Sequence, residues 1–113
     1  MQNKKEIFAI IGAMDCEIQK LKELMQNIEQ INHNELTIFV GTINGYKIIL
    51  SQSGVGKVNA ALNTQYIIDK YSPNYIINTG VAGGIKTNLK VGDIVIGETL
   101  LQHDFDVTAL GYA

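Results

Sequence analysis

The feature that most constrains the fold is a run of apolar side chains at residues 7–11 (IFAII), which stops at Gly12. An uninterrupted apolar run of this length is typical of a strand that is buried on both faces of a sheet. Apolar residues then recur at helical spacing, at Ile18, Leu21, Met25 and Ile28. The pattern predicts a core strand followed by an amphipathic helix.

The junction between this strand and this helix carries an isolated carboxylate, Glu17. Open α/β sheets bind ligands at the carboxyl ends of their strands, and a carboxylate placed there can hold and deprotonate a water. Acidic residues are also common in the first turn of a helix, because they favour the positive end of its dipole. Taken alone, the residue is more often a cap than a catalytic group, and both roles stay open at this point.

The middle of the chain predicts a β-hairpin. Residues 26–35 are polar without useful periodicity, which indicates a surface connection. Residues 36–41 and 46–51 are rich in β-formers, and the Asn44-Gly45 pair between them is a strong turn signal.

A second helix is predicted over residues 57–71, because Gly54-Val55-Gly56 precedes it and Pro73 follows it. Residues 75–79 form a further buried strand that is closed by the glycine-rich segment 80–84. Another strand is predicted at 94–98, extending towards Leu101.

The order of elements predicts an α/β fold in which a mixed central sheet is flanked by helices, with residues 1–113 as part of a single domain. A sheet with continuous apolar strands needs cover on both faces. Two helices barely supply one face, so the fold looks incomplete.

Composition restricts the function. The chain has 113 residues, 46% of them apolar, and a net charge of −2. It has no excess of positive charge that would attract nucleic acid or an anionic membrane. It also has no apolar segment long enough to span a bilayer. The single cysteine, Cys16, fits a reducing compartment, so we expect a cytoplasmic protein.

Two motifs fail on inspection. Gly54-Val55-Gly56-Lys57 suggests a phosphate loop, but Ser51 and Val58 stand where that loop needs glycine and a hydroxyl residue. Residues 103–106 (HDFD) lack a complete set of metal ligands. No metal and no cofactor is therefore expected.

Five segments taken together are more specific than any one of them. They are residues 11–14 (IGAM) with Glu17, 53–61 (SGVGKVNAA), 76–84 (IINTGVAGG), 89–95 (LKVGDIV) and 103–108 (HDFDVT). Together they resemble the bacterial 5'-methylthioadenosine/S-adenosylhomocysteine nucleosidases of the nucleoside phosphorylase superfamily. Members of that family are about twice as long, so the chain resembles their amino-terminal half.

The resemblance implies an enzyme that uses water to cleave the bond between adenine and a thioribose. Glu17 matches the residue that positions and deprotonates the water, which reverses the preference for a cap. In that family an Asp protonates adenine and a Glu binds the ribose hydroxyls. Neither residue matches a position within residues 1–113.

Binding residues follow by the same resemblance. Val81, Ala82 and Gly83 match the loop that lies along the purine and ribose. Met14 and Val55 match apolar groups near the sugar and its 5'-thio substituent. Val107 and Leu110 match residues that a neighbouring subunit contributes, which implies a homodimer.

Three alternatives to an active nucleosidase remain open on the sequence. They are an inactive truncated fragment of such an enzyme, a related purine nucleoside phosphorylase, and a futalosine hydrolase. The sequence contains no Arg, and Lys57 is a poor replacement for the bidentate guanidinium groups that bind phosphate. Hydrolysis is therefore favoured over phosphorolysis.

Overall fold

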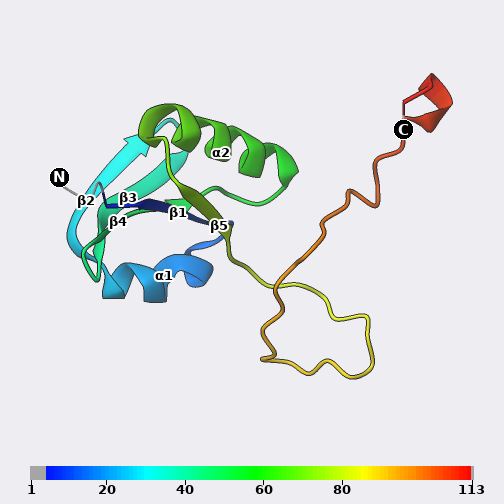
Figure 1. The fold of residues 1–113 in the computed structure, drawn as a ribbon, viewed down its shortest axis with the longest axis horizontal. Helices are drawn as coiled ribbons and strands as arrows, with labels where there is room; N and C mark the ends of the chain where they lie inside the picture. Colours follow the sequence, from blue (N-terminus) through cyan, green and yellow to red (C-terminus); the bar gives the residue numbers. More distant parts are fainter. Residues whose placement is uncertain (1–4, 113) are drawn as a thin grey trace. The chain divides into compact units, whose positions relative to one another are not determined.

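The computed structural model describes residues 5–112, which divide into two units at Ala82 and Gly83. The first unit contains all the strands and both α-helices (Figure 1). In chain order these are β1 (Ile7–Gly12), α1 (Asp15–Leu24), β2 (Gln26–His33), β3 (Leu36–Ile43), β4 (Tyr46–Gln52), α2 (Lys57–Tyr71) and β5 (Tyr75–Asn78). The second unit contains one short 3-10 helix, η1 (Thr108–Leu110), with turns before it.

The sheet is mixed, as predicted. Its strand order is β2-β3-β4-β1-β5, with β1 parallel to both β4 and β5, whereas β2, β3 and β4 form an antiparallel meander. The predicted hairpin is confirmed: Asn44 and Gly45 both have positive φ, the conformation that a tight two-residue turn requires. The predicted bounds of α2 are also confirmed.

Successive residues of β1 pack on opposite faces of the sheet, as the two-residue period of a strand requires. Ile10 belongs to a core cluster with Ile18 of α1, and Ile11 belongs to a second cluster with Ile67 of α2. The two helices accordingly lie on opposite sides of the sheet (Figure 1). Each face thus receives one helix, and β5, predicted to be buried, is exposed, so the prediction that two helices leave the sheet incompletely covered is confirmed.

The connection predicted at residues 26–35 is wrong, because most of it forms β2. The strand lies at the edge of the sheet, and all its side chains except Ile31 are exposed, so its sequence lacks the apolar alternation of a half-buried strand. The first helix also ends earlier than its spacing suggested. Met25 is already extended, with ψ 147°, and Ile28 belongs to β2.

The strand predicted at residues 94–98 is also wrong. In the second unit this segment has no regular structure, and Ile94 and Ile96 are about nine-tenths exposed. Within the described residues no neighbouring strand pairs with it, and a strand without a pairing partner leaves its backbone hydrogen bonds unmade. No helix among residues 5–112 is both long and apolar enough to cross a membrane.

Candidate functional site

The carboxyl ends of three parallel strands meet at one edge of the sheet. Backbone hydrogen bonds hold the loops that follow them: Ser53 N donates to Gly12 O at 2.9 Å, and Thr79 N donates to Ile11 O at 2.9 Å. Gly54 N also donates to Ala13 O at 3.1 Å. The segments after β1, β4 and β5 are thereby fixed side by side, at the edge where open α/β sheets bind ligands.

Gly12 lets α1 begin close against this edge. A Cβ on Gly12 would lie 2.6 Å from Cγ2 of Ile18 and 3.3 Å from Cβ of Glu17. Ile18 is fully buried in the core under α1, so it has little room to move. The glycine therefore allows the first turn of α1 to pack directly on the end of β1.

The Glu17 carboxylate turns back over the start of its own helix. Its Oε2 accepts hydrogen bonds from Ala13 N at 2.7 Å and Met14 N at 3.0 Å. These are backbone donors that no residue within the helix can satisfy, so Glu17 does cap α1. The cap also fixes the carboxylate in place, because two donors hold one of its oxygens.

The same carboxylate lines an open pocket of about 320 Å³. The lining residues are Ala13, Glu17, Asn78, Thr79, Gly80 and Val81. Glu17 is the one ionisable side chain in this lining. The capping role and a place at the pocket, weighed as alternatives on the sequence, therefore occur together in one residue.

Of the residues predicted to bind a ligand, Val81 shares this pocket with Glu17. Met14 precedes the first turn of α1, and Val55 lies in the loop between β4 and α2, with 70% of its surface exposed. Those two loops are joined by the hydrogen bond from Gly54 to Ala13. Ala82 is exposed and directly follows Val81.

Gly83, Val107 and Leu110 belong to the second unit. Leu110 lies in η1 and is 75% exposed, whereas Val107 is half-buried. Asp106 organises this turn, since its Oδ1 accepts hydrogen bonds from the backbone N and the hydroxyl of Thr108. Both hydrogen bonds lower the pKa of Asp106, and the bond from the Thr108 hydroxyl has the larger effect.

Four pocket residues were absent from the predicted site: Ala13, Asn78, Thr79 and Gly80. Ala13 belongs to the motif 11–14, whereas the other three belong to the segment 76–84 that was singled out for its motif and stand at the end of β5. Because β5 is parallel to β1, their position beside Glu17 follows from the topology. Within the described part of the chain, no group of three or more His, Cys, Asp or Glu residues could hold a metal ion.

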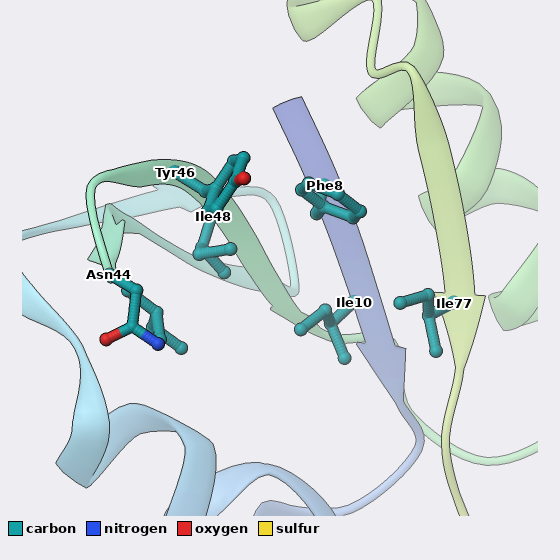
Figure 2. Close-up of a pocket in the computed structure, with 7 residues that line it drawn as sticks. Phe8, Ile10, Asn44, Tyr46, Ile48 and Ile77 are labelled. Carbon is teal, nitrogen blue, oxygen red and sulfur yellow. The ribbon is translucent and has the colours of Figure 1, made fainter. Parts of the chain in front are cut away.

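A second pocket, of about 250 Å³, lies on the face of the sheet that carries α1 (Figure 2). It is lined by Phe8, Ile10, Ile43, Asn44, Tyr46, Ile48 and Ile77. Phe8 stacks on Tyr75 with ring centroids 5.0 Å apart. Its lining holds no carboxylate, imidazole or amine, and the phenol of Tyr46 is its one ionisable group.

The fold and the first pocket define an α/β protein with a carboxylate at the ligand-binding edge of its parallel strands. A sequence model of the phosphorylase superfamily matches residues 7–113. The chain belongs to that superfamily, and the predicted resemblance and fold class are confirmed.

Individual relatives are more specific. The chain is 50% identical over 105 residues to a 5'-methylthioadenosine/S-adenosylhomocysteine nucleosidase of Hydrogenovibrio crunogenus, covering 93% of this chain and 45% of the relative. The crystal structure of such a nucleosidase from Neisseria meningitidis, in complex with methylthio-immucillin-A, superposes with a TM-score of 0.92 at 45% identity. That match covers 96% of this chain and 47% of the other.

A futalosine hydrolase of Helicobacter pylori is similar in structure but more distant in sequence. Its TM-score is 0.86 and its identity 30%, over 95% of this chain and 46% of the other. The chain thus spans about half the length of each of these relatives.

Proposed function

We propose that this chain provides the water-activating part of an N-glycosyl hydrolase that acts on 5'-methylthioadenosine and S-adenosylhomocysteine. The observation that carries the proposal is the Glu17 carboxylate, held by two backbone donors at the edge of a pocket beside the end of β5. The names of the relatives at 50% and 45% identity support the choice of substrate.

In this reaction Glu17 accepts a proton from a water as the water oxygen bonds to the anomeric carbon of the ribose. The bond between that carbon and adenine breaks, its electron pair leaves with adenine, and a general acid protonates the departing base. The products are adenine and a thio-substituted ribose. A positioned base contributes a factor of about 10²–10⁴ to the rate of such a step.

The residues that match the family's binding positions supply binding. Val81, Ala82 and Gly83 lie along the purine and ribose, while Met14 and Val55 contact the sugar and its 5'-thio group. Val107 and Leu110 complete the thio pocket of the neighbouring subunit in a homodimer. The proposed location of the enzyme is the cytoplasm.

Two related activities are less well supported. A futalosine hydrolase shares the fold at 30% identity, against 45% and 50% for the nucleosidases of Neisseria meningitidis and Hydrogenovibrio crunogenus. A phosphorylase needs a cationic cradle for phosphate, and this chain has no Arg. No Lys lines the pocket beside Glu17.

The test is release of the free purine base by the complete gene product that carries residues 1–113, measured as adenine from the two thionucleosides and as hypoxanthine from futalosine. Methylthioadenosine, S-adenosylhomocysteine and futalosine are assayed at equal concentration. The two thionucleosides are expected to be cleaved, with futalosine at least about tenfold slower in kcat/KM. Faster cleavage of futalosine, or no cleavage of the thionucleosides, would reject the proposed substrate.

A further inference from the structure

The two oxygens of the Glu17 carboxylate have different surroundings. Oε2 accepts the hydrogen bonds from Ala13 and Met14, whereas Oε1 faces Gly80 at the end of β5. A Cβ built on Gly80 would lie 3.1 Å from Oε1, 3.6 Å from Cδ and 3.8 Å from Oε2. Oε1 is therefore the oxygen that the missing side chain of Gly80 leaves uncovered.

Backbone conformation does not account for glycine at this position. The φ angles of Gly45, Gly54 and Gly56 are positive, but that of Gly80 is not. The φ angle of Gly80 therefore does not require glycine. What the glycine provides is space, because a contact of 3.1 Å is closer than nine in ten real Cβ contacts.

A water bound to a carboxylate lies about 2.5–3.0 Å from the oxygen. A methyl carbon 3.1 Å from Oε1 would cover that side of the oxygen and crowd a water bound there. Both Glu17 and Gly80 line the pocket of about 320 Å³. Oε2 is already occupied by its two backbone donors, which leaves Oε1 to face the reactant.

We infer that Gly80 is a positioning residue: its missing side chain keeps the place next to Glu17 Oε1 open for the attacking water. The inference rests on the proposed hydrolase function. Gly80 acts through Glu17 and is not itself a catalytic group.

The test is Gly80→Ala in the complete gene product, with kcat and KM measured on methylthioadenosine. We expect kcat to fall at least about tenfold while KM stays within about twofold, because the water and not the nucleoside loses its place. The matched control is Gly84→Ala, whose new Cβ meets Leu89 at an ordinary 3.5 Å and should leave both constants within about twofold. An unchanged kcat for Gly80→Ala, or an equal loss in the control, would overturn the inference.

A double-variant cycle separates positioning from a general structural effect. If Gly80 acts only through Glu17, adding Gly80→Ala to Glu17→Gln should lower kcat no further than Glu17→Gln alone. A further tenfold loss in the double variant contradicts the inference.

Thermal unfolding tests the same contact independently of activity. If Gly80→Ala lowers the melting temperature, combining it with Glu17→Ala should cost less than the two separate losses added together, since the new methyl then meets no carboxylate. Additive losses would contradict the contact. If the unaltered protein releases no adenine, the proposed function fails while this cycle still decides whether Gly80 and Glu17 are coupled.

Discussion

Ser51 of β4 donates a hydrogen bond of 2.7 Å to Oδ1 of Asn63 of α2, and both side chains are fully buried. The bond crosses from the sheet to the helix among apolar neighbours. It leaves Asn63 Nδ2 without a partner among the described residues. A buried amide in this position depends on its one good hydrogen bond.

Ser51→Ala is expected to destabilise the fold by about 1–3 kcal/mol, because it leaves the buried Asn63 oxygen unpaired. The measurement is urea unfolding of the complete gene product. Gln65→Ala, on the exposed surface of the same helix, is the control and should change stability by less than about 0.5 kcal/mol. Equal effects of the two variants would show that the buried bond contributes nothing.

Glu17→Gln is expected to lower the kcat for adenine release at least about 100-fold, because an amide cannot accept the proton from water. Gln still reaches the backbone donors at the helix start, so the melting temperature and the affinity for adenine should change little. A loss of kcat below about tenfold would reduce Glu17 to a cap of α1.

Gly12→Ala is expected to lower both stability and turnover. Its Cβ would meet Ile18 Cγ2 at 2.6 Å, so α1 must shift, at a cost of about 1–3 kcal/mol. The shift carries Glu17 with it, and kcat should fall while the helix content measured by circular dichroism is retained. Full stability with full turnover would show that α1 has room to adjust.

Hydrolysis is expected to need neither phosphate nor added metal. Residues 1–113 contain no Arg to hold phosphate, and the described residues contain no metal-ligand cluster. Turnover in phosphate-free buffer should equal that with phosphate, and EDTA should have no effect. A sugar 1-phosphate product, or inactivation by EDTA that zinc or magnesium reverses, would contradict this prediction.

Residues 1–113 by themselves are expected to release no measurable adenine. Glu17 is the one ionisable side chain that lines the pocket, so a general acid for the departing adenine is missing from the lining. A chimera in which this chain replaces the matching part of the Hydrogenovibrio crunogenus nucleosidase supplies the rest of that relative and should be active. Turnover by the 113 residues at the rate of the chimera would contradict the prediction.

The parts of the fold that were predictable are those whose signal is local. The apolar run of β1, the Asn44-Gly45 turn and the glycine and proline that bound α2 each act within a few residues. Strand β2 was missed because edge pairing with β3 stabilises it, and its exposed side chains carry little apolar pattern. The segment 94–98 shows the converse, since β-forming residues make no strand without a pairing partner.

The candidate site was predictable only in part for a similar reason. Glu17 stands next to a recognisable strand end, and its motif indicates a role. The closeness of Gly80 to Glu17 depends on the pairing of β5 with β1, which no local pattern specifies. On the sequence, capping the helix and facing a pocket were alternative roles for the Glu17 carboxylate. In the structure the carboxylate does both.

The alternation along β1 links the two cores to the candidate site. Ile10 packs under α1 and Ile11 under α2, so a slip of β1 by one residue would exchange the two faces and bury the wrong side chains on both. The slip would also move Gly12 away from Ile18, and with it the start of the helix that carries Glu17. Substitutions in either core can therefore displace Glu17 at the sheet edge, even at residues that do not contact a ligand.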